Sequence, residues 1–220
     1  MVRAVSIYRM KTIELNEANH DSVLEHAREL ITQAGVIVMP TDTVYGLVCD
    51  ARDEGAIRKM FVIKQRLLER VFPIFVKDIA TARRYAYISD AKARFLDSIW
   101  PGAVTVVFRQ KGKLPAILTG GQDTIGIRVP AHPFLLELLA RLDFPLAQTS
   151  ANISNEPPAK NKEEIERYFN GSEVQLDLII DAGQILGASS TVIDFTGESP
   201  IIARSGLVSK QDLDRMLKDF

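Results

Sequence analysis

The segments AVTVVF (residues 103–108) and TIGIRVP (residues 124–130) decide the fold class. Apolar residues, most of them β-branched, fill the first segment, which is typical of a buried strand. The second alternates with the two-residue period of a sheet. Strands and helical segments follow one another without strict strand–helix repeats, which favours a mixed sheet over a doubly wound parallel fold. We predict one α/β (α+β) domain: a twisted, mixed parallel and antiparallel sheet flanked by helices.

The other elements follow from the same periodicities. Short apolar runs predict strands at residues 36–40, 73–76, 144–148, 176–181, 190–195 and 200–204. Apolar residues at helical spacing predict helices at residues 20–34, 53–63, 91–100, 133–142 and 210–217. Because no repeat or linker interrupts this pattern, residues 1–220 are expected to form one domain, with the chemically informative segments between residues 36 and 206.

The composition is that of a globular domain, with 46% hydrophobic and 25% charged residues in 220. No apolar run is long enough to cross a bilayer, and the first residues lack the apolar core of a signal peptide. Cys49 is the only cysteine, which precludes an intramolecular disulfide and favours a reducing, cytoplasmic location. One cysteine and three histidines also argue against a structural zinc site.

Charge is distributed unevenly although the net charge is only −1. Residues 52–94 contain eleven Lys or Arg and five Asp or Glu, whereas residues 160–220 contain seven basic and eleven acidic residues. A basic segment in a near-neutral protein indicates an anionic ligand or a nucleic-acid surface. Solvated helix faces explain the same charges without any partner.

Two segments place small polar residues at the end of a strand. PTDTVYGL (residues 40–47) brings hydroxyls and a carboxylate to a turn, where they satisfy the backbone or contact a ligand. TSAN (residues 149–152) suits a helix N-cap as well as ligand hydrogen bonds. Neither GxGxxG after the first strand nor GxxxxGK[ST] is present, so a nucleotide would be held in another way.

Cations occupy two chemically informative positions. Lys64 and Arg66 follow an apolar helical stretch, where they complement the helix dipole or clamp an anion. Arg128 interrupts an alternating strand and should share a face with Thr124 and Gly126, whose backbone a ligand could approach closely. A buried guanidinium requires an anionic partner, either a carboxylate of the chain in a structural ion pair or a ligand.

Two further segments, GASSTVID (residues 187–194) and IIARSG (residues 201–206), again join hydroxyls or an arginine to a strand. His132 lies between two prolines and is interpreted as a turn residue. Because no serine or histidine occupies a recognisable nucleophile turn, a Ser-His-Asp triad is not indicated.

The order of these segments and the residues within them resemble those of the YrdC-like family of threonylcarbamoyl-AMP synthases. The family pattern runs PT(D/E)TVYGL, KxR, WPG(P/A)xT, xxxRxP, SAN, STxxD and RxG. This chain has PTDTVYGL, KQR, WPGAVT, TIGIRVP, TSAN, SSTVID and ARSG in that order. The resemblance covers residues 36–206, and the family's twisted mixed sheet with a concave basic cavity agrees with the fold predicted from periodicity.

The resemblance implies a role for each matching residue. The residues that would bind L-threonine are Thr43, Arg128, which would pair with the carboxylate and so gain its counter-charge, and Ser190. The residues that would bind ATP are Lys64, Arg66, Thr124, Ser150, Asn152 and Arg204. Lys64 and Arg66 would also act in catalysis by holding the phosphates.

The implied enzyme is a nucleotidyltransferase that forms threonylcarbamoyl-AMP and pyrophosphate from L-threonine, bicarbonate and ATP. Its task is to position and neutralise anions, for which no protein nucleophile is needed. Mg²⁺ would arrive on ATP with few ligands of its own from the protein. The product would serve N6-threonylcarbamoyladenosine modification of tRNA, through a downstream transferase.

The sequence departs from the family pattern at three places. Leu67 stands where a proline usually follows KxR, within a stretch about two residues longer than usual, so no nucleotide contact is assigned to Arg70. Lys77 stands where some members have a histidine. Only a short helix is expected after Gly206, so the extra C-terminal domain of longer members is not expected.

Other functions fit parts of this pattern. A non-catalytic protein of the same fold could bind tRNA or double-stranded RNA through the basic segment, although the usual aromatic stacking array of RNA-binding modules is missing. A related enzyme acting on another carbamoyl donor would be expected in a longer chain with zinc-finger cysteines. A non-catalytic paralogue is disfavoured by the presence of both KQR and SAN.

Overall fold

The computed structural model describes residues 10–67, 71–172 and 174–217. Arg70 and the two residues before it, in the segment after KQR that is longer than usual for the family, lie outside the described residues. The strands are β1 (Thr12–Glu14), β2 (Ile37–Met39), β3 (Gly46–Asp50), β4 (Ile74–Phe75), β5 (Val104–Arg109), β6 (Thr124–Arg128), β7 (Leu146–Ser150), β8 (Leu178–Asp181), β9 (Thr191–Asp194) and β10 (Ile201–Arg204). The helices are α1 (His20–Thr32), α2 (Glu54–Ile63), α3 (Ile79–Tyr85), α4 (Asp90–Ile99), α5 (Ala116–Thr119), α6 (Pro133–Arg141), α7 (Lys162–Phe169) and α8 (Lys210–Leu217).

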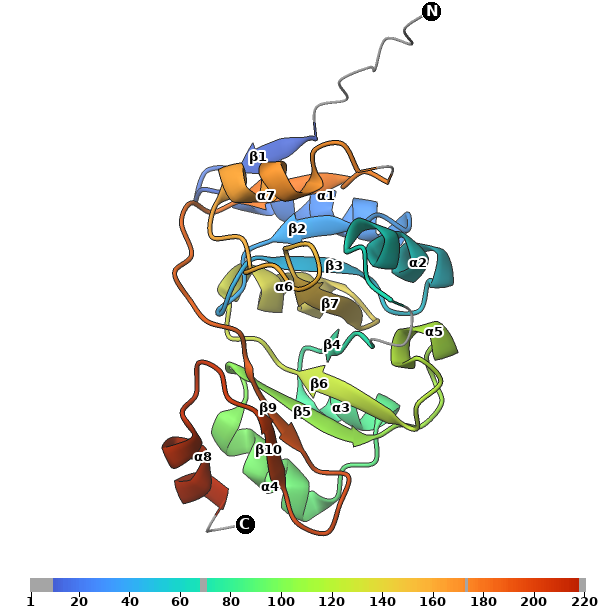
Figure 1. Cartoon of the computed structure of the whole chain (residues 1–220), viewed down its shortest axis with the longest axis vertical. Helices are drawn as coiled ribbons and strands as arrows, with labels where there is room; N and C mark the ends of the chain where they lie inside the picture. Colours follow the sequence, from blue (N-terminus) through green and yellow to red (C-terminus); the bar gives the residue numbers. More distant parts are fainter. Residues whose placement is uncertain (1–9, 68–70, 173, 218–220) are drawn as a thin grey trace, which may run out of the picture.

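The strands that the structure describes form one sheet in the order β1-β8-β2-β3-β7-β4-β6-β5-β9-β10 (Figure 1). The pairs β1–β8, β8–β2, β4–β6 and β5–β9 are parallel. The pairs β2–β3, β3–β7, β7–β4, β6–β5 and β9–β10 are antiparallel. The predicted mixed α/β sheet is therefore confirmed. Strands β1, β3 and helices α3, α5 and α7 were not predicted from the sequence.

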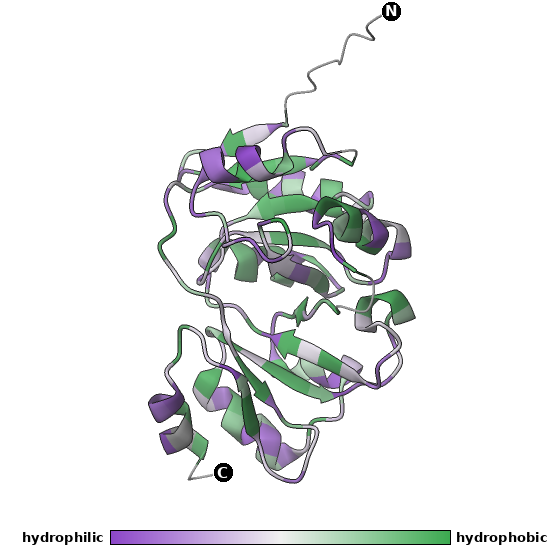
Figure 2. Cartoon of the chain, viewed as in Figure 1, coloured by the Kyte–Doolittle hydropathy of each residue, from purple (hydrophilic) through white to green (hydrophobic). Residues whose placement is uncertain are grey.

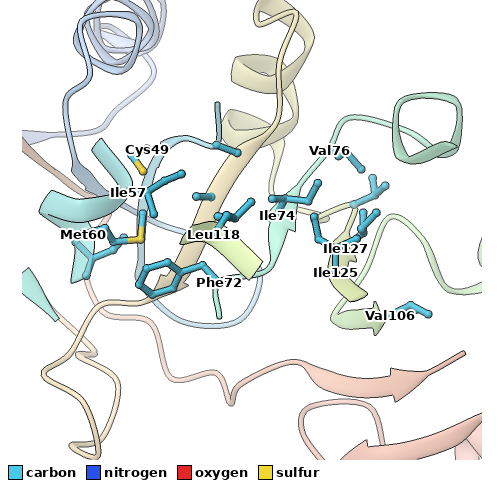
Figure 3. Packing of buried hydrophobic residues seen from close by; sticks show 14 of the residues in the cluster. Cys49, Ile57, Met60, Phe72, Ile74, Val76, Val106, Leu118, Ile125 and Ile127 are labelled. Atoms are coloured by element: carbon cyan, nitrogen blue, oxygen red, sulfur yellow. The ribbon is translucent and has the colours of Figure 1, made fainter. Parts of the chain in front are cut away.

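Two hydrophobic cores hold the helices on the sheet. The smaller core joins α1 and α6 to strands β2, β7 and β8. The larger core joins α2, α4 and α7 to β3, β5 and β6, and Figure 3 shows part of it around Met60, Phe72 and Ile127. The strands are mostly apolar, whereas polar residues lie on the outer faces of the helices (Figure 2). In the described residues, no helix combines the length and the apolar character needed to cross a membrane.

Local signals explain where α2 begins and ends. The Asp53 carboxylate accepts a hydrogen bond from the backbone N–H of Ala56 at 2.7 Å, which caps the first turn. The helix ends at Ile63 with Lys64 as its C-cap, and the next residue, Gln65, has a positive φ of 49°. The backbone therefore leaves the helical path directly before Arg66.

The alternation of β5 and β6 gives the sheet one core face and one open face. Ile125 and Ile127 of β6 are buried in the larger core, whereas Thr124, Gly126 and Arg128 line a cavity on the other face. On β5, Val104 and Val106 belong to the core and Thr105 and Val107 to the cavity. The two-residue period of these strands therefore places the polar residues of TIGIRVP together on the open face, as predicted.

Candidate active site

A cavity of about 340 Å³ lies on this open face, where β5, β6, β9 and β10 meet the turn before β3 and the end of β7. Its volume is in the range of small-ligand sites. Of the nine residues assigned to the site from the sequence, seven line this cavity: Thr43, Arg66, Thr124, Arg128, Ser150, Ser190 and Arg204. The other two, Lys64 and Asn152, lie behind Ser150. Segments separated by up to 160 residues in the chain thus meet in one site.

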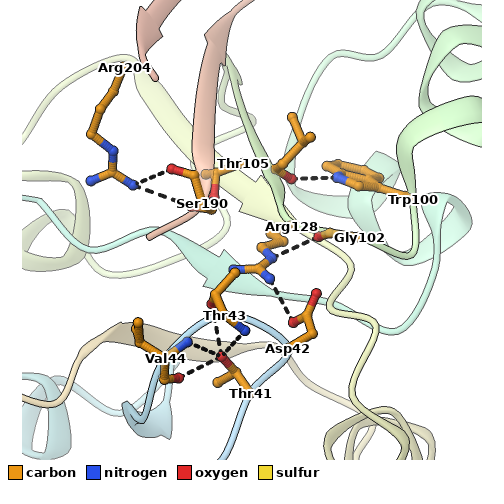
Figure 4. A network of polar contacts seen from close by, with 11 residues as sticks. Thr41, Asp42, Thr43, Val44, Trp100, Gly102, Thr105, Arg128, Ser190 and Arg204 are labelled. Atoms are coloured by element: carbon orange, nitrogen blue, oxygen red, sulfur yellow. Dashed lines mark hydrogen bonds and ion pairs between the residues drawn. The ribbon is translucent and has the colours of Figure 1, made fainter. Parts of the chain in front are cut away.

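Arg128 is buried, with only 2% of the residue exposed, and each of its three nitrogens donates a hydrogen bond within the chain (Figure 4). Nε donates to the Gly102 carbonyl at 2.8 Å, Nη1 to the Thr43 hydroxyl at 3.1 Å, and Nη2 to Asp42 Oδ1 at 2.6 Å. Burial lowers the pKa of Arg128, an effect that the Asp42 carboxylate opposes. A guanidinium has five N–H groups, so one on each terminal nitrogen is left over from these bonds.

The counter-charge of Arg128 therefore comes from Asp42, with which it forms an ion pair. The expectation that a ligand carboxylate provides this counter-charge was wrong, because the adjacent turn already supplies a carboxylate. The role of Arg128 towards a substrate carboxylate stays a prediction. Sequence reasoning noted the carboxylate of PTDT but gave Asp42 no role, since the pairing joins residues 86 positions apart.

The turn before β3 is held together by the hydroxyl of Thr41. This hydroxyl donates to the Val44 carbonyl at 2.6 Å and accepts from the backbone N–H groups of Thr43 and Val44 at 3.0 and 3.2 Å. It also lies 2.9 Å from the hydroxyl of Thr43. Thr41 and Thr43 are buried, so PTDT forms both the capped turn and part of the cavity wall.

A second polar group, formed by Ser190, Thr105 and Arg204, lies across the cavity (Figure 4). The Thr105 and Ser190 hydroxyls are 2.9 Å apart, and Arg204 Nη2 donates to the Ser190 carbonyl at 2.8 Å. Burial lowers the pKa of Arg204. Thr105 was missed as a site residue, although the alternation of residues 103–108 already places it opposite the core residues Val104 and Val106.

Lys64 forms the cationic group behind Ser150. Only 2% of Lys64 is exposed, and its Nζ donates to the Ser150 carbonyl at 2.8 Å and to Asn152 Oδ1 at 2.6 Å. The Ser150 hydroxyl donates to the same Asn152 oxygen at 2.6 Å. Burial, with a smaller effect of the Arg66 charge, lowers the pKa of Lys64 to about 7. Within the described residues no carboxylate forms an ion pair with this ammonium group.

Arg66 lines the cavity near Val71 and Phe72. Its Nη2 donates to the Val71 carbonyl at 2.9 Å, and its guanidinium carbon lies 5.0 Å from the centre of the Phe72 ring. These contacts hold the half-buried side chain at the wall of the cavity, which Ser150 also lines.

Several charges of the basic segment form ion pairs with acids of the chain. The pairs are Arg52 with Asp50, Arg58 with Glu54, and Arg83 with Asp90. Arg52 and Arg58 are half exposed, so these two pairs belong to the solvated helix and turn surface. These pairs favour the interpretation that much of the basic segment at residues 52–94 is a solvated surface. Arg66 lines the cavity, and Lys64 lies behind Ser150.

The chain also approaches itself closely above the PTDT turn. A Cβ atom added to Gly187, in the loop between β8 and β9, would lie 1.8 Å from the carbonyl oxygen of Thr43. Only a glycine therefore allows this loop to lie against the turn. The contact fixes the position of the segment that carries Ser190 relative to Thr43.

Known proteins share this sequence pattern and this fold. Residues 29–206 match the Sua5/YciO/YrdC family, which is described as "Telomere recombination". A threonylcarbamoyl-AMP synthase of Pyrococcus abyssi is 30% identical over 210 residues, which are 94% of this chain and 61% of the relative. This chain thus spans less than two thirds of the length of that relative.

Solved structures give the same result. The structure of P. abyssi Sua5 complexed with L-threonine superposes with a TM-score of 0.86 at 29% identity and covers 95% of this chain and 61% of the longer one. Escherichia coli YciO superposes with a TM-score of 0.81 at 27% identity and covers 93% of this chain and 98% of YciO. The family match includes most of the chain and every segment that lines the cavity, so this protein belongs to the Sua5/YciO/YrdC family.

Proposed function

We propose that this protein is an L-threonylcarbamoyladenylate synthase, which makes threonylcarbamoyl-AMP and pyrophosphate from L-threonine, bicarbonate and ATP. The observation that carries the proposal is one cavity bordered by two cationic groups, which we take as its two ends: Arg128 beside Thr43, and Arg66 with Lys64 behind Ser150. An amino-acid carboxylate and a nucleotide triphosphate are two anions that need such ends. The name of the P. abyssi relative and its complex with L-threonine support the assignment.

The threonine end is assigned to Thr43, Arg128 and Ser190. The unused N–H groups of Arg128 can donate to the substrate carboxylate while the Asp42 pair keeps the guanidinium in place. The hydroxyl of Ser190 is oriented by its contacts with the Thr105 hydroxyl and with Arg204. These three residues lie across the cavity from Thr43. The side chain of threonine would lie between these two walls.

The ATP end is assigned to Arg66, Ser150 and the residues behind it. Arg66 offers a planar fork for phosphate oxygens, and Lys64 and Asn152 fix Ser150 from behind. Thr124 and Arg204 also line the cavity, Arg204 in contact with Ser190, and both are assigned to the nucleotide.

The reaction requires placement of substrates and stabilisation of charge. The threonine amine attacks the carbon of bicarbonate, and loss of water leaves a carbamate. A carbamate oxygen then attacks the α-phosphorus of ATP, and pyrophosphate leaves with the electron pair of the broken P–O bond. Both steps bring anions together, so fixed cations and hydrogen-bond donors lower the barrier without a covalent intermediate on the protein.

Mg²⁺ is assigned to the substrate as MgATP. The cavity wall offers hydroxyls and amides, such as those of Ser150 and Gln148, and no group of three or more acids, histidines or cysteines forms a cage among the described residues. This donor set fits an ion that keeps most of its ligands from phosphate and water. The ion would neutralise the phosphate charge that Lys64 and Arg66 meet.

The product is a mixed anhydride, which is prone to hydrolysis. We therefore assign its consumption to a transferase that delivers the threonylcarbamoyl group to the N6 amine of an adenosine in tRNA. The free, buried Cys49 is compatible with the reducing cytoplasm in which such a reaction would occur.

Release of pyrophosphate tests the proposal. The protein is mixed with MgATP, L-threonine and bicarbonate, and each component is left out in turn. Release that requires both threonine and bicarbonate, and that falls in Arg66→Ala and Arg128→Ala, is the expected result. Absence of release, together with RNA binding that weakens steeply with salt, would instead identify a non-catalytic RNA-binding protein of this fold.

A further inference from the structure

Two hydroxyls of the cavity wall, those of Thr105 and Ser190, leave one proton unused. They lie 2.9 Å apart and belong to residues that are 4% and 6% exposed. Each hydroxyl has one proton, so the single hydrogen bond between them uses one of the two protons, whichever residue donates it. Neither hydroxyl donates to another acceptor among the residues that the structure describes. One proton is therefore left, and it can be donated to a ligand in the cavity.

Arg204 adds positive charge to this pair of hydroxyls. Its Nη2 donates to the Ser190 carbonyl at 2.8 Å and to the Ser190 hydroxyl at 3.3 Å, whereas its Nε and Nη1 have no acceptor within the described part of the chain. No carboxylate there forms an ion pair with Arg204, in contrast to the pair of Arg128 and Asp42. The pKa of Arg128 is lowered mainly by burial and further by the charge of Arg204, so the two guanidinium groups repel each other. An anion between them would remove this repulsion.

The register of the sheet places the hydroxyl pair beside Arg128. Val106 of β5 pairs with Ile127 of β6, so the residues next to them, Thr105 and Arg128, are neighbours across the two strands. Both line the cavity on the open face. The hydroxyl pair thus lies beside the guanidinium that we assign to the threonine carboxylate, and Arg204, which contacts the pair, is assigned to the nucleotide.

The proposed reaction requires bicarbonate at such a junction. Its carbon becomes bonded to the nitrogen of threonine, and one of its oxygens becomes bonded to the α-phosphorus of ATP. Bicarbonate must therefore lie between the two other substrates when it reacts. It is a small planar anion with three oxygens, which suits hydroxyl and guanidinium donors. The cations at the two ends of the cavity are already assigned to the threonine carboxylate and to the triphosphate.

We propose that Thr105, Ser190 and Arg204 form the bicarbonate subsite of the cavity. The inference rests on the proposed function and deepens it, because it gives residues to the third substrate and a role to Thr105. The donors hold the oxygens of bicarbonate and leave its carbon open to the amine. The unused hydroxyl proton and the guanidinium also stabilise the negative charge that grows on these oxygens as the N–C bond forms. Ser190 and Arg204 keep their contacts with threonine and the nucleotide, to which the carbamate is joined in turn.

Substitution of Thr105 tests this subsite. Thr105→Val keeps the shape and removes the hydroxyl, whereas Thr105→Ser keeps a hydroxyl and should lose much less affinity for bicarbonate. Thr119→Val is a matched control, because Thr119 is 1% exposed and its hydroxyl is hydrogen-bonded, but it does not line the cavity. The KM values for bicarbonate, L-threonine and MgATP are measured by pyrophosphate release. Nitrate, an unreactive planar anion of the same charge, serves as a probe of the subsite, with equimolar chloride as the control for ionic strength.

The expected result is an effect on one substrate. The KM for bicarbonate should rise by about tenfold or more in Thr105→Val, as for one lost hydrogen bond to a charged group, whereas the KM values for L-threonine and MgATP change by less than about twofold. Nitrate should compete with bicarbonate in the wild type and inhibit Thr105→Val more weakly. An unchanged KM for bicarbonate, equal rises in all three KM values, or the same rise in Thr119→Val would overturn the proposal.

Arg204→Gln provides an independent measurement if Thr105→Val does not fold, since Arg204 lies on the exposed edge strand β10. Its KM for bicarbonate should rise by about tenfold, and a rise confined to the KM for MgATP would overturn the proposal. An active wild type in which nitrate does not compete with bicarbonate would refute this inference alone. A wild type that releases no pyrophosphate with all three substrates would instead refute the proposed function, and this inference with it.

Discussion

Arg128 and Lys64 are both buried cations, each 2% exposed, but the groups around them differ. Arg128 forms an ion pair with Asp42 and hydrogen bonds with Gly102 and Thr43. Among the described residues, Lys64 donates to neutral oxygens alone, those of the Ser150 carbonyl and the Asn152 amide. The pKa of Lys64 accordingly falls to about 7 through burial.

This difference gives the two ends of the cavity different tasks. At the Arg128 end, the chain itself balances the charge, so the guanidinium is fixed before a ligand arrives. At the Lys64 end, no acid among the described residues balances the charge, which makes an anionic group such as a triphosphate favourable there. The fold therefore combines a rigid recognition end with an end whose charge depends on binding.

The largest effect is expected from Arg128→Met. It removes the ligand contact and leaves the mostly buried Asp42 without a partner, so threonine-dependent turnover should fall by about 100-fold or more and the free energy of unfolding by about 3 kcal/mol. Pyrophosphate release and urea denaturation measure the two losses. Arg128→Met combined with Asp42→Asn should recover most of the stability but none of the turnover. A double variant no more stable than Arg128→Met would contradict the role given to this ion pair.

Lys64→Met should have the opposite effect on stability. It removes a buried charge without an acid partner, and Asn152 Oδ1 keeps its bond from Ser150, so the free energy of unfolding should change by less than about 1 kcal/mol or rise. The affinity for ATP should fall by about tenfold at pH 7, as measured by calorimetry. Destabilisation as large as that of Arg128→Met would remove the distinction between the two ends.

The pH dependence of stability gives a further check on Lys64. Its pKa is lowered in the folded state, so the folded protein binds fewer protons than the unfolded chain between about pH 7 and the usual lysine pKa. The wild type should therefore gain stability relative to Lys64→Met as the pH rises through this window. Denaturation curves at pH 6.5 and 9 measure the difference, and parallel behaviour of the two proteins would argue against a neutral, buried lysine.

A smaller and more local effect is expected from Gly187→Ala. Its Cβ would clash with the Thr43 carbonyl, so the loop must shift, at a cost of about 1–3 kcal/mol in stability. Because the shift occurs at the threonine end, the KM for threonine should rise more than the KM for ATP. Gly197→Ala is a suitable control, since its Cβ would meet the Ser199 carbonyl oxygen at an ordinary contact distance of 3.8 Å, its φ is not positive, and both glycines lie outside regular elements. An equal rise in both KM values would show that the two ends are not independent.

Most of the fold could be predicted because apolar residues recur in most of its helices and strands at the spacing typical of that element. Helix α2 is an example, since the residues expected to face inward, Ala56, Ile57, Met60 and Phe61, are all buried. Strand β3 was missed because all five of its residues are buried and show no alternation. Helix α7 was missed for the opposite reason, since only Ile165 and Phe169 are buried in a mostly charged segment.

The candidate site could be predicted as a set of residues but not as a network. The alternation of β6 placed Arg128 with Thr124 and Gly126, which the cavity confirms. The ion pair with Asp42 and the hydrogen bond from Lys64 to Asn152 join residues 86 and 88 positions apart. Such contacts depend on how the sheet brings β6 and β7 to the PTDT and KQR segments, which no local pattern reveals.

Proton uptake on binding of MgATP tests the difference between the two ends most directly. The heat of binding is measured at pH 8 in two buffers with different ionisation enthalpies, for the wild type and for Lys64→Met. If the phosphates supply the missing counter-charge, Lys64 passes from mostly neutral to protonated, and the wild type should take up about one proton more than the variant. Equal proton uptake by the two proteins would contradict this account of the Lys64 end.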